Sequence, residues 1–157
     1  MDLFHWLTCA EPIRVSAHAL GNCTNSTTLE DVAATFEFSD GSIASLLYTA
    51  AGSSSFPKER LEVFCDGTAV ALDDYHSLTI RGKKRIDVRH RRADKGHTAE
   101  LTHFSDAVLG KAPPQTTHLD GIRATICCLK LLDSVKSGQP QEIDLSDFYA
   151  VIEQTRP

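Results

Sequence analysis

The sequence lacks the features that mark membrane, secreted and disulfide-stabilised proteins. It has no run of about 18 apolar residues, the length that a membrane-spanning helix needs. Asp2 and His5 interrupt the apolar start of the chain, which is wrong for a signal peptide. The five cysteines are an odd number without a C-x-x-C pair, which favours free, buried thiols over a disulfide framework. We therefore expect a cytoplasmic protein with no membrane partner.

Signatures of nucleotide binding and acyl transfer are also missing. The chain has no G-x-G-x-x-G, no P-loop and no G-x-S-x-G, so we expect no cofactor site within it. A net charge of −5 argues against nucleic acid as a partner. The basic segment 81–92 departs from that average, and it is typical of an edge strand whose charges oppose aggregation.

What the chain does contain is a long segment, 31–74, with the pattern of an antiparallel sheet. It opens with alternating apolar and polar residues, as in a strand with one buried face. Asp40-Gly41 and Asp66-Gly67 each separate two apolar runs, and Asp-Gly in that setting is the strongest short-range signal of a hairpin. Further alternating runs near 13–18 and 77–90 bring the expected count to about seven strands.

Helical periodicity replaces alternation after Arg92 and predicts helices over 95–109 and 119–136, with a short one over 147–154. The apolar stripes are Leu101, Phe104 and Val108 in the first helix, and Ile122, Ile126, Leu129 and Leu132 in the second. With 157 residues, 41% of them hydrophobic, the chain fits one domain, 1–157. The predicted class is α+β: an open, mainly antiparallel sheet of about seven strands with helices packed on one face.

Three places have residues suited to chemistry. The loop 53–60, SSSFPKER, offers hydroxyls and Lys58 to a hydroxylated or anionic ligand, although its charges can instead pair among themselves. His97, Glu100 and His103 follow at steps of three on a helix, which spreads them over about 120° and argues against a metal site. Cys127-Cys128 lies mid-helix among aliphatic residues, so buried structural thiols are expected rather than a nucleophile.

Several different short motifs are spaced along the chain. They are Asp2–Leu7 (DLFHWL), 31–40 followed by GSI, Phe56–Arg60 (FPKER), Lys95-Gly-His-x-x-Glu100 and Ser134-x-x-x-Gly138-x-Pro140. Together they resemble the C-terminal domain of Gfo/Idh/MocA-family oxidoreductases from Asp2 to about Asp144. The Ser55–Arg60 loop and Leu72-Asp73-Asp74 are most similar to variants in which this domain is fused behind a zinc-type alcohol dehydrogenase-like region.

The resemblance implies a division of labour. In the family, a Rossmann domain binds NAD or NADP and supplies a lysine, while the C-terminal domain faces the substrate and carries a His-x-x-Asp pattern. Asp2 matches that Asp, but the His, the lysine and the Rossmann domain have no counterpart in this sequence. The chain is therefore expected to be a fragment or truncated product, catalytically incomplete alone, without catalytic, cofactor or metal residues.

The implied role is to bind a sugar-like substrate and to dimerise. The candidate substrate-binding residues are Asp2, Tyr48, Ser53, Ser54, Ser55 and Lys58. Segment 43–50 is apolar on both faces, so one face needs a cover that a twofold-related sheet can provide, as in a homodimer. The alternatives are a stand-alone binding or scaffold module without redox activity and a small metal-dependent enzyme around His97 and Glu100.

Overall fold

The computed structural model describes residues 1–20, 30–146, 148 and 149, and over these the fold is α+β, as predicted. Contacts divide the chain into two compact units, Met1–Ala51 with Thr116–Pro157, and Gly52–Gln115. All seven predicted strands are present and antiparallel, and with one more short strand they form two four-stranded sheets rather than one sheet. Most of the predicted last helix lies outside the described residues.

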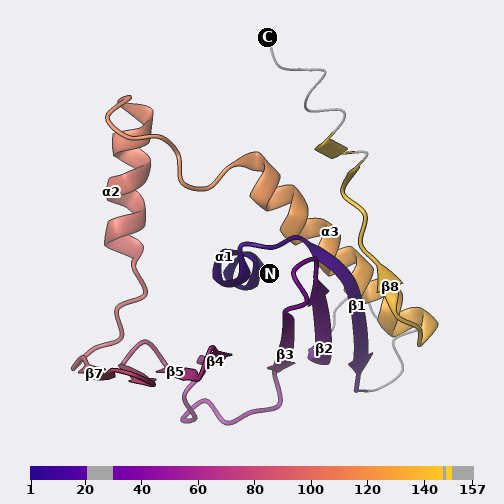
Figure 1. Cartoon of the computed structure of the whole chain (residues 1–157), viewed down its shortest axis with the longest axis horizontal. Helices are drawn as coiled ribbons and strands as arrows, with labels where there is room; N and C mark the ends of the chain where they lie inside the picture. Colours follow the sequence, from indigo (N-terminus) through magenta and orange to yellow (C-terminus); the bar gives the residue numbers. More distant parts are fainter. Residues whose placement is uncertain (21–29, 147, 150–157) are drawn as a thin grey trace. The chain divides into compact units, whose positions relative to one another are not determined.

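The first unit contains a sheet with the strand order β3-β2-β1-β8 and two helices (Figure 1). Its elements are α1 (Asp2–Thr8), β1 (Pro12–Ala19), β2 (Asp31–Phe38), β3 (Ile43–Thr49), α3 (His118–Ser137) and β8 (Gln141–Glu142). The β2–β3 hairpin turns where the Asp-Gly signal predicts. Gly41 has φ +86°, and the Asp40 carboxylate accepts hydrogen bonds from the backbone N–H and hydroxyl of Ser42 at 2.9 and 2.8 Å.

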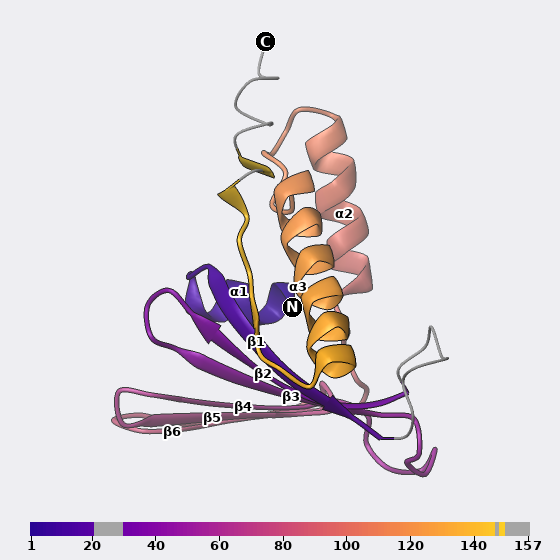
Figure 2. The same cartoon turned by 90° about the vertical axis from the view of Figure 1, so that its right-hand side faces the viewer.

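α3 covers one face of this sheet and packs chiefly on β1 (Figure 2). The helix begins with a capping box between Thr117 and Asp120 and ends at Gly138, whose φ is +67°. The core between the two layers contains Val15, Ala17, Val32, Ala34, Phe36 and Phe38 from the sheet, and Ile126, Cys127 and Leu131 from α3. The phenyl ring of Phe4 on α1 lies 6.5 Å from that of Phe36.

The buried face of α3 differs from the predicted apolar stripe. Ile126 is buried as expected, but Leu129 is 54% exposed, so its predicted burial is wrong. Arg123 and Ser134 take inward positions because each satisfies its polar groups there. Ser134 accepts a 3.0 Å hydrogen bond from the Ala17 N–H, on an edge of β1 that the two-residue strand β8 does not reach.

The second unit is a four-stranded meander followed by one helix. Its elements are β4 (Arg60–Cys65), β5 (Thr68–Asp73), β6 (Ser77–Arg81), β7 (Arg85–Arg89) and α2 (His97–Val108). Strand pairing aligns eight aliphatic residues on one sheet face: Leu61, Val63, Val70, Leu72, Leu78, Ile80, Ile86 and Val88. None of them is fully buried, and α2 buries no residue, with Leu101, Phe104 and Val108 about two-thirds exposed.

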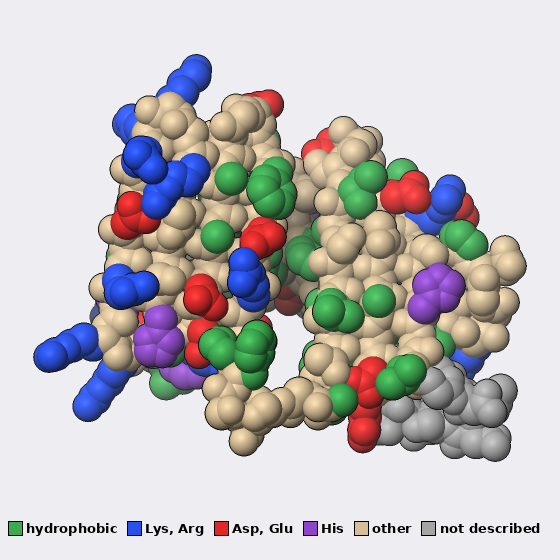
Figure 3. Space-filling model, turned by 90° about the horizontal axis from the view of Figure 1, so that it is seen from below, with side chains coloured by type: hydrophobic (Ala, Val, Ile, Leu, Met, Phe, Trp, Pro, Cys, Tyr) green, Lys and Arg blue, Asp and Glu red, His purple; other side chains and the backbone are tan. Residues whose placement is uncertain are grey.

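Charge is unevenly divided between the units. Gly52–Gln115 holds eleven of the sixteen Lys and Arg residues but only nine of the twenty-one Asp and Glu residues. Figure 3 shows the resulting concentration of Lys and Arg side chains over the second unit. Part of it is the basic segment 81–92, which contains the edge strand β7, as predicted.

No helix of the described chain is long and apolar enough to cross a membrane.

Candidate binding site

An open hollow in the second unit is the candidate binding site, and it includes the SSSFPKER loop singled out in the sequence. Its volume is about 400 Å³, within the range of small-molecule sites. The lining residues are Ser54, Ser55, Phe56, Pro57, Lys58, Asp74, Ala93 and Lys95. Three of the six predicted substrate-binding residues, Ser54, Ser55 and Lys58, thus line one hollow.

Three separate segments form this hollow, and hydrogen bonds fix each of them. In the first segment, Phe56 N–H donates to the Ser53 carbonyl at 3.0 Å, and the Ser53 and Ser55 hydroxyls lie 2.9 Å apart. Ser53 therefore shapes the loop although it does not line the hollow. The second segment is the β5–β6 turn, where Asp74 N–H donates to the Glu59 carbonyl at 2.7 Å and so holds the turn beside the loop.

The third segment, between β7 and α2, is anchored to the same turn. His90 N–H donates to the His76 carbonyl at 2.7 Å, and the His76 Nδ1 lies 3.3 Å from the His90 carbonyl oxygen. Farther along, the Asp94 carboxylate accepts the Gly96 N–H at 2.9 Å. These bonds order the chain on both sides of Ala93 and Lys95, so the second lysine reaches the hollow from a constrained backbone.

Asp74, Ala93 and Lys95 also line the hollow, although none of them was among the predicted site residues. The turn has unusual backbone geometry, with Asp74 at φ +45° and Tyr75 at φ +56°, the left-handed values expected in tight hairpin turns. The Lys95 ammonium lies 5.6 Å from the centre of the Tyr75 ring, a cation–π contact. An Asp-Asp-Tyr turn signal was available in the sequence, but nothing local indicated that it would meet Ser54 and Lys58.

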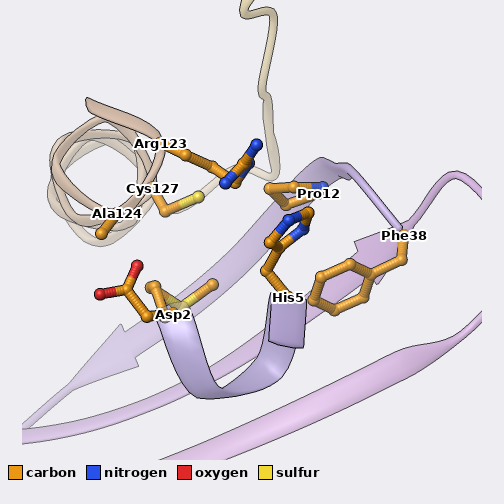
Figure 4. Close-up of a pocket in the computed structure, with 8 residues that line it drawn as sticks. Asp2, His5, Pro12, Phe38, Arg123, Ala124 and Cys127 are labelled. Carbon is orange, nitrogen blue, oxygen red and sulfur yellow. The ribbon is translucent and has the colours of Figure 1, made fainter. Parts of the chain in front are cut away.

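The remaining predicted residues, Asp2 and Tyr48, belong to the first unit. Tyr48 on β3 pairs with buried Val32 and is 54% exposed. Asp2 lines a narrow hollow between α1 and α3 that has no room for a water molecule. Figure 4 shows Asp2 and His5 on α1, with Arg123, Ala124 and Cys127 on α3. A substrate role for Asp2 and Tyr48 stays a prediction.

Arg123 also lines this narrow hollow, and its guanidinium makes four hydrogen bonds. Its guanidinium donates to both Glu11 carboxylate oxygens at 2.9 and 3.0 Å, to Asp120 at 2.8 Å and to the Tyr149 hydroxyl at 3.2 Å. Burial lowers the pKa of Arg123, but these bonds outweigh it and the net shift is upward. Because each of the three guanidinium nitrogens donates to a protein group, the role of Arg123 here is structural.

The cysteines divide between buried and exposed thiols. Burial raises the pKa of Cys127 to about 11, so it is the inert structural thiol that the sequence predicted. Cys128, Cys9 and Cys65 are exposed, and the prediction that they are buried is wrong. For Cys128 the reason is the helix itself, because consecutive residues are rotated about 100° apart and cannot both face the sheet. Cys23 lies outside the described residues.

His97, Glu100 and His103 on α2 have separate environments. The His97 Nδ1 lies 3.9 Å from the Glu100 carboxylate, and both side chains are nearly four-fifths exposed. The His103 Nε2 instead accepts a hydrogen bond from the Gln115 N–H at 3.2 Å, which directs it toward the loop after the helix. Within the described chain, no group of three or more His, Cys, Asp or Glu residues is arranged to hold a metal ion.

The α+β fold of this chain recurs within solved oxidoreductases. UDP-N-acetylglucosamine 3-dehydrogenase GnnA from Acidithiobacillus ferrooxidans matches with a TM-score of 0.72 and 21% identity over 87% of this chain and 44% of its own. Aldose-aldose oxidoreductase from Caulobacter crescentus, complexed with glycerol, gives a TM-score of 0.74 and 16% identity over 90% and 44%. The WlbA dehydrogenase from Bordetella pertussis, in complex with NADH and UDP-GlcNAcA, gives 0.58 and 16% over 92% and 42%.

These similarities establish a shared fold. The chain spans less than half the length of each of these three oxidoreductases, so it corresponds to one portion of them. No family model matches the chain, and no curated protein matches it either.

Proposed function

We propose that this chain is the substrate-binding and dimerisation domain of an NAD(P)-dependent sugar oxidoreductase of the Gfo/Idh/MocA type, with the redox cofactor held by a different domain. The observation that carries the proposal is the fold match, in which about nine-tenths of the chain aligns with less than half of several oxidoreductases. The spaced sequence motifs support the family assignment independently. The closer similarity to variants fused to a zinc-type alcohol dehydrogenase-like region stays a prediction.

The division of labour follows from what each part offers. Oxidation of a sugar hydroxyl passes hydride to nicotinamide and requires a base for the hydroxyl proton. The hollow offers hydroxyls, ammonium groups and a carboxylate, which suit binding and orientation of a polyol. Two neighbours, WlbA and an oxidoreductase from Agrobacterium radiobacter, have structures with NADH and NAD+, which favours NAD for a full-length enzyme.

A binding experiment tests the substrate role. Amide shifts of the ¹⁵N-labelled chain are followed by NMR while glucose or NAD+ is added at millimolar concentration. We expect glucose to shift the amide peaks of residues around the hollow and NAD+ to shift none. In a separate activity assay, NAD(P)-dependent oxidation of glucose by the chain is expected to equal the buffer blank. Turnover above the blank, or an NAD+ response without a glucose response, would contradict the proposal.

Dimerisation is supported by β3, the edge strand of the first sheet. Its side chains Ile43 and Leu47 are 70% and 79% exposed, as expected for an apolar face that a second copy of the chain buries in a dimer. We expect light scattering on the purified chain to give the mass of a dimer. The double variant Ile43→Asp with Leu47→Asp is expected to give the mass of a monomer. Leu129→Asp, on exposed Leu129 of α3, is the matched control and should leave the dimer intact. A monomeric wild-type chain at high concentration would rule out this part of the proposal.

A further inference from the structure

We infer that the hollow recognises a sugar that carries an anionic group, a carboxylate or a phosphate, with Lys58 and Lys95 as the anion-binding pair. The inference rests on the proposed substrate role and specifies the class of substrate. It depends on the meeting of two lysines, 37 positions apart in sequence, in one open hollow.

The charge balance of the hollow favours an anion. Two ammonium groups and a single carboxylate, that of Asp74, line it, so it is net positive. Within the described chain neither lysine lies within ion-pair distance of a carboxylate. The Lys95 ammonium also contacts the face of the Tyr75 ring, which does not neutralise its charge. A bound carboxylate or phosphate would offset the positive charge of the hollow and would accept charge-assisted hydrogen bonds from lysine ammonium groups that line it.

The rest of the lining suits a sugar ring rather than a bare anion. Ser54 and Ser55 can donate or accept hydrogen bonds, and the Asp74 carboxylate can accept them from ring hydroxyls. Phe56, 74% exposed, and Pro57 supply an apolar surface against which the C–H face of a sugar can lie. This mixture of a few polar groups with apolar surface is typical of sites for small ligands.

The experiment compares ligands of equal ring and different charge on the full chain. Glucose is the neutral ligand, glucuronate carries a carboxylate and glucose 6-phosphate carries a phosphate, and each is titrated by NMR at low ionic strength. We expect at least one anionic sugar to bind about fivefold or more tightly than glucose, and salt to weaken that preference. Whichever of glucuronate and glucose 6-phosphate binds more tightly identifies the anionic group that the hollow recognises.

Removing a positive charge and removing a negative charge from the hollow should change anion affinity in opposite directions, which distinguishes charge recognition from structural damage. Lys58→Gln and Lys95→Gln are each expected to weaken binding of the anionic sugar about fivefold and that of glucose by a smaller factor. Lys111→Gln, which changes a lysine of the same unit outside the hollow, should have no effect on either sugar. Asp74→Asn should strengthen binding of the anionic sugar, because it removes a like charge, and asparagine tolerates the positive φ.

The outcomes distinguish the inference from the proposed function. Equal affinity for glucose and both anionic sugars, or equal effects of the Lys58, Lys95 and Lys111 substitutions, would overturn the anionic class and leave the substrate role standing. Absence of any shift at the hollow with all three sugars would overturn the substrate role itself.

Discussion

At the scale of single residues, the best-defined interactions of the chain surround Arg123. The hydrogen bond between Arg123 and Glu11 joins positions 112 residues apart and connects the residue before β1 to the second turn of α3. Thr117-x-x-Asp120 has the spacing of a capping box, so the helix start had a local signal. The burial of Arg123 had no local signal in the sequence, because it depends on the carboxylate of Glu11 from a distant segment.

Asp120 makes the first turn of α3 sensitive to acid. The backbone N–H and hydroxyl of Thr117 donate to its carboxylate, Arg123 adds a third bond, and together they lower the pKa of Asp120 from 3.8 to about 2. A carboxyl with a depressed folded-state pKa stabilises the fold fully above its unfolded value, near pH 4, and this contribution disappears as the pH falls toward 2.

We therefore expect Asp120 to contribute on the order of 1 kcal/mol to the free energy of unfolding above pH 4, after allowance for partial solvent exposure. Urea unfolding at pH 6, 4 and 2.5 measures it. Asp120→Asn should be less stable than wild type at pH 6, with the difference shrinking toward pH 2.5. Asp106→Asn, at partly exposed Asp106 of α2, serves as control. A difference that does not change with pH would contradict the assignment.

At the scale of elements, prediction from sequence succeeded where the signal was local. The Asp-Gly turns fixed the hairpins, and α2 and α3 lie within two residues of their predicted bounds. β8 was missed because it has two residues and forms only by pairing with β1. Leu129 was misplaced because apolar periodicity ignores Ser134, which turns inward to bond the Ala17 N–H.

α2 and α3 have similar amphipathic patterns and different environments. α3 buries five residues, whereas α2 buries none among its twelve. A helix of this length without a packed face is marginal in water. We expect the amide hydrogens of α2 to exchange with solvent at least tenfold faster than those in the middle of α3, as measured by mass spectrometry at neutral pH. Equal protection would mean that the Leu101, Phe104 and Val108 stripe is covered in solution.

At the scale of the whole molecule, local reasoning has a clear limit. The hollow is formed by residues near positions 54–58, 74 and 93–95, and only the first of these groups was identified from the sequence. The other two reach it through the β5–β6 turn and the segment after β7, whose contacts depend on the register of the meander. Sequence patterns predict turns and periods, but not which of the turns meet.

The two units also differ in how they are stabilised. Every fully buried hydrophobic residue among those described belongs to the first unit, while the aliphatic face of the second unit's sheet is only partly covered. Buried apolar area is the main favourable term in folding, so the second unit should be the less stable one.

We expect urea to unfold the chain in two steps, with the Gly52–Gln115 unit first. Amide peaks of Val63 and Val70 report the second unit in NMR spectra, and those of Val15 and Phe36 report the first. Phe36→Ala, which removes a fully buried ring at a cost of about 3–5 kcal/mol, should lower only the later midpoint, because its packing partners lie in the first unit. Val70→Ala should lower only the earlier one. Coincident midpoints for all four amides, or a shift of both steps by either substitution, would show that the units unfold as one cooperative domain, since independent cores cannot transmit such a change.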